Sequence, residues 1–125
     1  MEKIEVYLDS DGIMRVEHPI HANITIYHIQ EEYEKRIDIT SRKTPLLVKI
    51  HGVASFSEEA QTFLCGADHS AITSAVALVS NPKAGYAEHS KILMGSFKSR
   101  FDPPFEIRSF EDEEPAIIWL KTHLR

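Results

Sequence analysis

Three residues within about one helical turn carry groups that could act together in nucleophilic catalysis. Cys65 supplies a thiol, and Asp68 and His69 supply groups that could accept its proton. Catalytic Cys–His pairs are normally brought together from distant parts of a sequence, and a reactive thiolate requires an electropositive environment. Cys65 instead follows Phe63 and Leu64 at the end of an apolar helical pattern. The sequence therefore predicts a buried, inert cysteine and no catalytic residue.

The seven histidines raise the question of a metal site, because imidazole is a common ligand of transition metals. His18 and His21 flank a proline, and no aspartate or cysteine stands at a typical ligand spacing from them. The others fall on separate predicted elements: His28, His51, His69, His89 and His123. A metal site needs three or four converging ligands. We therefore expect scattered surface histidines and no bound metal, and the absence of glycine-rich phosphate-binding motifs predicts no cofactor.

Composition and charge narrow the class of protein. The 125 residues are 42% hydrophobic and 26% charged, as in an ordinary soluble domain, so we expect one domain over residues 1–125. The formal charge of -5 argues against a general nucleic-acid binder. A single cysteine excludes an internal disulfide and fits a reducing compartment. The apolar runs are far shorter than the roughly 20 residues that cross a membrane, and a cytoplasmic, bacterial-type protein is expected.

The hydrophobic pattern predicts an α/β protein with the element order ββαβαβαβα. Strands are expected at residues 3–8, 13–18, 46–50, 72–80 and 105–110. Helices are expected after Asn23 or Thr25 as cap, around 60–67, from Asn81-Pro82 to about Phe97, and from about 112–114 onward. The first two strands form a hairpin around Gly12, and the later strands run parallel because each helix acts as a crossover.

The first of these helices has an apolar stripe and charged pairs. Its expected inner face carries Ile26, Ile29, Tyr33 and Ile37 at helical spacing. Two i,i+4 pairs of opposite charge, Glu31–Lys35 and Glu32–Arg36, are expected on the outer face, where such pairs stabilise a helix.

Residues 51–60, with the sequence HGVASFSEEA, follow an apolar strand and lead into a helix whose cap is Ser57 or Ser55. Strand-to-helix loops are where α/β proteins usually place working residues. The next such position, Asn81-Pro82 followed by Lys83, could form an anion site at a helix N-terminus, although a solvated helix face is the favoured interpretation.

Three blocks of the chain carry a family resemblance. They are DGIMRVE, PLLVKIHGVASFSEEA and the stretch from AVALVSNP to FDPPFEIRSFEDEEPAIIWL, and the most specific part runs from Phe110 through Leu120. Over nearly its whole length the chain resembles a family of small bacterial domains with the SpoIIAA-like, or STAS-like, fold. The resemblance implies a mixed sheet with helices mainly on one face, and members of this group have no established enzymatic activity.

The wider STAS class includes anti-anti-sigma factors, which bind a partner kinase and are switched by phosphorylation of a serine in an Asp-Ser-Ser-Gly motif. Matching Gly52-Val53 to the loop before that motif puts its two serines on Glu58 and Glu59. A carboxylate carries one negative charge, whereas a phosphoserine carries nearly two. The resemblance therefore implies a capped helix start with a fixed acidic surface and argues against a phosphorylation switch.

These observations predict a non-catalytic, regulatory STAS-like domain that binds a protein partner or a second copy of itself. The expected interaction surface comprises His51, Ser55, Ser57, Glu58, Glu59, Asn81 and Lys83. The alternative is a domain that binds a small molecule or lipid, as some distant relatives of this fold do. That function would require an apolar pocket between sheet and helix, beneath Tyr86, Leu93 and Phe97.

Overall fold

A mixed five-stranded sheet organises the computed structural model, which describes residues 4–18, 23–50, 55–80, 95–97, 99–101 and 103–124. The strands are β1 (Glu5–Leu8), β2 (Met14–Glu17), β4 (Thr44–Ile50), β6 (Thr73–Ser80) and β7 (Glu106–Phe110), in the spatial order β1-β2-β4-β6-β7. β1 pairs antiparallel with β2, and the other neighbours pair in parallel. The expected α/β class and mixed sheet are confirmed.

The first two strands form the expected hairpin, and its turn is set by local hydrogen bonds. The Asp9 carboxylate accepts the backbone N–H groups of Asp11 (2.9 Å) and Ile13 (3.0 Å). Gly12 has a φ of 87°, which residues with a side chain rarely adopt.

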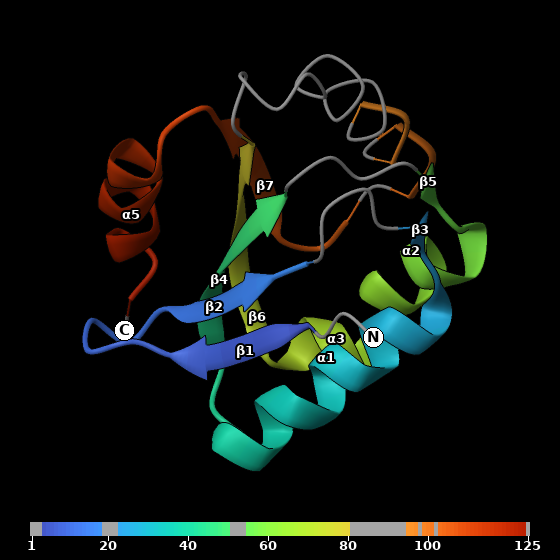
Figure 1. Ribbon diagram of the computed structural model, residues 1–125, viewed down its shortest axis with the longest axis horizontal. Helices are drawn as coiled ribbons and strands as arrows, with labels where there is room; N and C mark the ends of the chain where they lie inside the picture. Colours follow the sequence, from blue (N-terminus) through green and yellow to red (C-terminus); the bar gives the residue numbers. More distant parts are fainter. Residues whose placement is uncertain are drawn as a thin grey trace.

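Helices cover both faces of the sheet (Figure 1). The parallel strands follow one another in a single direction across the sheet, and right-handed crossovers then put the described connecting helices on the same face. The described helices between them are α1 (Ile26–Ile39), α2 (Glu58–Leu64) and α3 (Ala67–Ala71), and we name this side the crossover face. α5 (Glu113–Lys121) follows the last strand instead of connecting two strands, and it packs on the opposite side, the α5 face.

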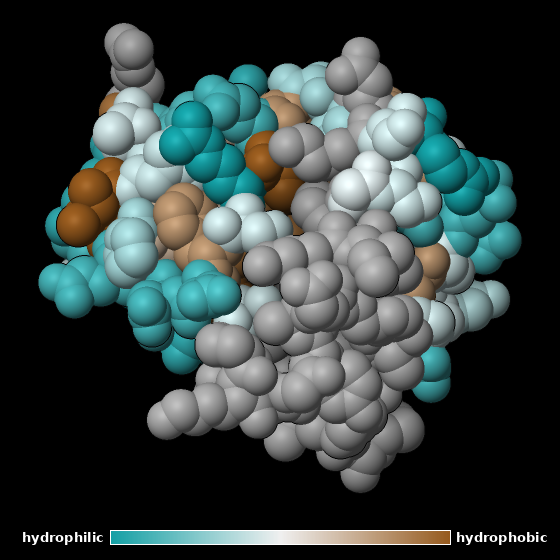
Figure 2. Space-filling view, turned by 90° about the horizontal axis from the view of Figure 1, so that it is seen from above, coloured by the Kyte–Doolittle hydropathy of each residue, from teal (hydrophilic) through white to brown (hydrophobic). Residues whose placement is uncertain are grey.

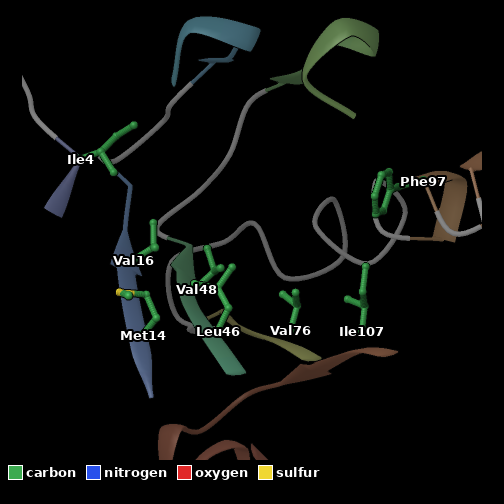
Figure 3. Packing of buried hydrophobic residues seen from close by; sticks show 8 residues of the cluster. All are labelled: Ile4, Met14, Val16, Leu46, Val48, Val76, Phe97 and Ile107. Carbon is green, nitrogen blue, oxygen red and sulfur yellow. The ribbon is translucent and has the colours of Figure 1, made fainter. Parts of the chain in front are cut away.

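The core on the crossover face comes from alternate residues of the strands (Figure 3). Leu46 and Val48 of β4 point to this side, whereas Leu47 between them points to the α5 face. The buried cluster consists of Ile4, Met14, Val16, Leu46, Val48, Val76, Phe97 and Ile107. Because β4 and β6 are covered on both sides, they need the nearly continuous apolar sequence from which they were predicted.

The α5 face is packed by small and branched side chains. Ala116 and Leu120 of α5 lie against Leu47, Ala75 and Ala77, and all five are buried. The three alanines allow the helix to approach the sheet closely. α5 begins directly after its cap Asp112, as predicted for a helix whose Pro115 must lie in the first turn.

The observed element order departs from the prediction in two places. Two very short strands, β3 (Asn23–Ile24) and β5 (Ser55–Phe56), pair in parallel with each other outside the main sheet. The helix expected around 60–67 is divided into α2 and α3, because Gly66 has extended backbone angles and starts a new helix. Of the helix expected from Asn81 to about Phe97, residues 81–94 lie outside the described residues, while 95–97 and 99–101 are helical.

Within the described part of the chain, no helix is both long and apolar enough to span a bilayer.

Candidate functional site

The pairing of β3 with β5 brings the first turns of α1 and α2 side by side. β3 leads directly into α1, and β5 leads into α2. The two strands are held together by the Ser57 N–H, which donates to the Ile24 carbonyl (2.8 Å), and by the Ser55 hydroxyl, which donates to Asn23 Oδ1 (2.7 Å). β2 and β4 lead toward β3 and β5, so this junction lies beyond the carboxyl ends of parallel strands, where α/β folds commonly place binding sites.

Side-chain caps fix both helix starts at this junction. Thr25 is the cap of α1, and its N–H donates to Nδ1 of His28 (3.0 Å). Ser57 is the cap of α2, and its hydroxyl accepts the Ala60 N–H (3.2 Å). Such a cap is typically worth about 1 kcal/mol. The choice left open between Ser55 and Ser57 is thereby settled, since Ser55 belongs to β5.

A shallow hollow lies between the two helix starts. It has a volume of about 460 Å³ and is lined by Ile26, Glu58, Glu59, Thr62 and Phe63. We name it the α1–α2 hollow. Ile26 and Phe63 give it an apolar floor, and Glu58 and Glu59, both exposed in the first turn of α2, give it an acidic rim. Hydrophilic side chains gather along the right-hand edge of Figure 2, where Figure 1 places α2.

The contacts described around the hollow include one exposed ion pair and one aromatic contact. Glu58 forms an ion pair with Arg100 (3.1 Å), but both side chains are more than half exposed, and such pairs contribute little. Phe63, in the floor of the hollow, is held in place because its ring packs edge-on against Tyr33, with ring centroids 5.7 Å apart. Tyr27, which follows Ile26 in α1, is 77% exposed. Among the described residues, the hollow therefore combines an apolar surface with two exposed carboxylates, of which Glu58 pairs with Arg100.

The predicted interaction surface is described only in part. Glu58 and Glu59 line the hollow, Ser57 caps the helix that carries them, and Ser55 lies exposed on β5. The remaining three predicted residues, His51, Asn81 and Lys83, lie outside the described residues.

A buried polar network on the crossover face was not predicted. Glu32 and Arg36 of α1 are only 2% and 1% exposed, and His69 of α3 is completely buried. The expectation that the Glu32–Arg36 pair lies on the outer face of α1 is therefore wrong, as is the inward position of Ile37, which is exposed. The other pair is where it was expected, with Lys35 Nζ 3.0 Å from Glu31.

Arg36 is the centre of this network. Its guanidinium donates to the Ile72 carbonyl (2.8 Å) and to the hydroxyls of Thr73 (3.0 Å) and Thr44 (3.4 Å). Burial lowers the pKa of Arg36 from its ordinary value, and the Glu32 carboxylate opposes that shift. Burial would by itself raise the pKa of Glu32, but His69 and Arg36 hold it below its ordinary value. The network thus ties α1 to β4, α3 and β6 through hydrogen bonds of the buried Arg36, whose charge is balanced by the buried Glu32 carboxylate.

The prediction of scattered surface histidines is also wrong for two of them. His69 and His18 are both buried, and Nδ1 of His18 has no hydrogen-bond partner among the described residues. Burial lowers the pKa of His18, although the nearby Glu32 acts in the opposite direction. His18 is therefore neutral in the folded protein near pH 7, because burial disfavours its charged form.

We expect His18→Gln to make the free energy of unfolding less dependent on pH on the acid side. The pKa of His18 is lower in the folded than in the unfolded chain, so the unfolded chain binds a proton first as the pH falls below about 6.5. The stability contribution of a neutral His18 is present above that pH and is lost below it, by up to about 1.4 kcal/mol per pH unit. Urea unfolding at about pH 7.5 and about pH 5.5 measures the difference. His123→Gln is the control, and equal pH dependence of wild type and His18→Gln would refute the assignment.

The surroundings of Cys65 and His69 do not favour the thiol–base pair, which the sequence itself disfavoured. Burial raises the pKa of the Cys65 thiol, which is the reverse of what a reactive thiolate requires. The His69 ring is engaged with Arg36 and lies 6.0 Å from the Phe105 ring, centroid to centroid. Cys65 is only partly buried, so the expectation of a buried cysteine is met only in part, and its inertness stays a prediction.

A second charged cluster lies on the α5 face, at the start of α5. Arg15 of β2 contacts both Asp9 (2.8 Å) and Glu113, and Lys49 of β4 lies 3.2 Å from Glu113. Burial would raise the pKa of Glu113, but Lys49 and Arg15 together lower it. The carboxylate also lies in the first turn of α5, where the helix dipole favours negative charge. This cluster fastens α5 to the sheet.

Other candidate sites receive little support from the described residues. No group of three or more histidine, cysteine, aspartate or glutamate side chains is arranged to hold a metal ion there. Phe97, expected over an apolar ligand pocket, is buried and packs against Phe56 and Phe101 with ring centroids 5.8 and 5.7 Å away. Tyr86 and Leu93 lie outside the described residues, so the pocket beneath all three stays a prediction.

Comparison with known proteins identifies a family. The model of a family described as "Domain of unknown function (DUF7793)" matches residues 6–124, which is almost the entire chain. No curated protein and no solved structure matches the chain.

Proposed function

The chain belongs to the DUF7793 family, and we propose that it is a non-catalytic protein-binding domain that uses the α1–α2 hollow as its contact face. The observation that carries this proposal is the meeting of an apolar floor, Ile26 and Phe63, with an acidic rim, Glu58 and Glu59. A partner segment that complements it has an apolar side chain flanked by lysine or arginine. The apolar group would bury surface on the floor, and the charges would fix its orientation.

The fold proposed for this function is SpoIIAA-like, or STAS-like, and the role proposed for the binding is regulatory. A hairpin followed by parallel strands, with the crossover helices on one face, supports that assignment. The position of the hollow supports it further, because Glu58 and Glu59 take the place that the resemblance gives to the switch serines. The acidic surface is then permanent and does not depend on phosphorylation.

The non-catalytic part of the proposal rests on the state of the groups that could react. Cys65 has a pKa raised by burial, and the His69 side chain is held inside the buried network. The hollow itself is lined by two carboxylates in the same exposed helix turn. Acid–base catalysis by paired carboxylates needs two environments that push their pKa values apart.

Selection from a random peptide library on the immobilised chain tests the proposed function. We expect enrichment of peptides that carry an apolar residue flanked by lysine or arginine. The double variant Glu58→Lys/Glu59→Lys should bind the selected peptides at least about tenfold more weakly, because like charges then meet across the contact. The matched control is Glu34→Lys/Asp38→Lys, which makes the same charge change on exposed α1 residues away from the hollow. Enrichment of acidic peptides, or equal binding by both double variants, would overturn the proposal.

A further inference from the structure

The buried imidazole of His69 lies between two groups of opposite charge. Its Nε2 atom is 3.1 Å from Arg36 Nη1 and 3.7 Å from Glu32 Oε2. Its other nitrogen, Nδ1, is 3.4 Å from the Thr73 hydroxyl. All of these side chains are buried, so each hydrogen bond made or lost among them carries a large energetic weight.

The chemistry of arginine decides which ring nitrogen carries the proton in this arrangement. A guanidinium has only donors and stays charged in proteins, so Arg36 Nη1 can contact Nε2 favourably only if Nε2 accepts. The His69 proton then lies on Nδ1, which points to the Thr73 oxygen. That oxygen is free to accept, since its own proton goes to the His69 carbonyl at 2.8 Å. The arrangement therefore contains a neutral His69 with Nδ1 protonated.

The same arrangement leaves the Glu32 carboxylate incompletely hydrogen-bonded. Its Oε2 atom is buried and has no hydrogen-bond partner among the described residues, although it lies 3.7 Å from His69 Nε2. Buried carboxylate oxygens are nearly always hydrogen-bonded, because an unmade bond costs the full desolvation of the group. A proton on Nε2 would give Glu32 Oε2 a hydrogen-bond donor. A small movement would bring the two atoms, now 3.7 Å apart, within hydrogen-bond distance.

We propose that His69 is a proton-operated switch, which accepts from Arg36 when neutral and donates to Glu32 when charged. Among the described residues, the charged groups that face it are Glu32 and Arg36 from α1, and the titratable His18 at the end of β2 lies near Glu32. In the neutral form the Glu32 and Arg36 charges balance. In the charged form Arg36 keeps its bonds to Thr73, Thr44 and the Ile72 carbonyl but loses its contact with His69.

The switch would change how α1 is attached to the rest of the fold. With His69 neutral, α3 is joined to α1 through Arg36. With His69 charged, it is joined through Glu32, one helical turn earlier in α1. Because α3 follows α2 after only Cys65 and Gly66, a shift of α1 against α3 also reaches α2.

Nitrogen NMR of the imidazole rings tests the switch directly, with the whole chain labelled with ¹⁵N and observed from about pH 7.5 to about pH 5, where imidazoles change charge. We expect His69 to show a protonated Nδ1 and an unprotonated Nε2 at the upper end, and two protonated nitrogens at the lower end, in a chain whose amide spectrum remains folded. Glu32→Gln, which removes the acceptor charge, should make His69 take up its second proton only at lower pH than in the wild type. The control is Glu34→Gln, an exposed change in the same helix, which should leave the titration unchanged.

Three results would overturn the proposal. They are an Nε2-protonated His69 at the upper end of the range, a His69 that stays neutral throughout while the fold persists, and a titration that Glu32→Gln leaves unchanged. If Glu32→Gln does not fold, the wild-type spectra still test the proposal, because they show both the tautomer of neutral His69 and its second protonation.

Discussion

Replacing Arg36 by methionine is expected to lower the free energy of unfolding by about 3–5 kcal/mol, the range for leaving an uncompensated charge buried. The change removes the donor to the Thr73 and Thr44 hydroxyls and to the Ile72 carbonyl, and it leaves the Glu32 carboxylate buried without its countercharge. Methionine fills similar space, so the loss reflects charge and hydrogen bonding more than a cavity. Urea unfolding near neutral pH measures it.

Two further variants separate the loss of the buried countercharge from a general effect of losing arginine. Arg42→Met removes an exposed arginine and should change stability by less than about 0.5 kcal/mol. The double variant Glu32→Leu/Arg36→Met should recover a large part of the stability that Arg36→Met loses, because no unpaired charge is then buried. A loss below about 1 kcal/mol for Arg36→Met would show that the pair is not buried in solution.

Replacing Leu120 by alanine is expected to cost about 2–5 kcal/mol, as for other large-to-small changes in a core. Leu120 is completely buried on the inner side of α5, against the alanines of β6 and Leu47 of β4. Because the surrounding side chains are small and branched, they can only partly fill the space that the change leaves. Thermal or urea unfolding monitors the loss.

The matched control lies two residues away on the same helix. Ile118 is 64% exposed, so Ile118→Ala should change stability by no more than about 0.5 kcal/mol. The contrast tests the packing of α5 on the face opposite to the crossover helices. Similar costs for the two variants would mean that α5 does not pack on the sheet as described.

The main sheet could be predicted because its strands carry simple patterns. β4 and β6 are buried on both faces and appear in the sequence as short apolar runs, while β1 and β2 alternate around a turn that needs Gly12. The start of α5 was equally well determined, since a proline is tolerated only in the first turn of a helix. Such local rules do not extend to β3 and β5, which are two residues long and are held by each other and by Ser57.

The buried network could not be predicted from the same rules. Glu32 and Arg36 form an i,i+4 pair of the kind that usually lies in solvent, and both residue types are rarely buried. They lie on the inner side of α1 because Thr44, Thr73 and His69 offer partners there, and these come from three other elements. The one local signal was spacing, since Glu32 and Arg36 lie three and seven residues after the buried Ile29.

The candidate surface was predicted in part for a related reason. Glu58 and Glu59 were identified from their place at a helix start, which is local information. Their apolar neighbour Ile26 belongs to α1 and comes near them only through the pairing of β3 with β5. The acidic rim was therefore visible in the sequence, whereas the floor that makes it a hollow was not.

Mapping a selected peptide onto the ¹⁵N-labelled chain by NMR shows whether the α1–α2 hollow binds a basic segment with an apolar anchor. We expect the largest amide shifts to fall on Ile26, Thr62 and Phe63 and on the two rim residues, and we expect these shifts to disappear in Glu58→Lys/Glu59→Lys. Shifts centred on another surface, such as the β1–β2 hairpin or the outer side of α5, and unchanged by that double variant would refute binding at the hollow.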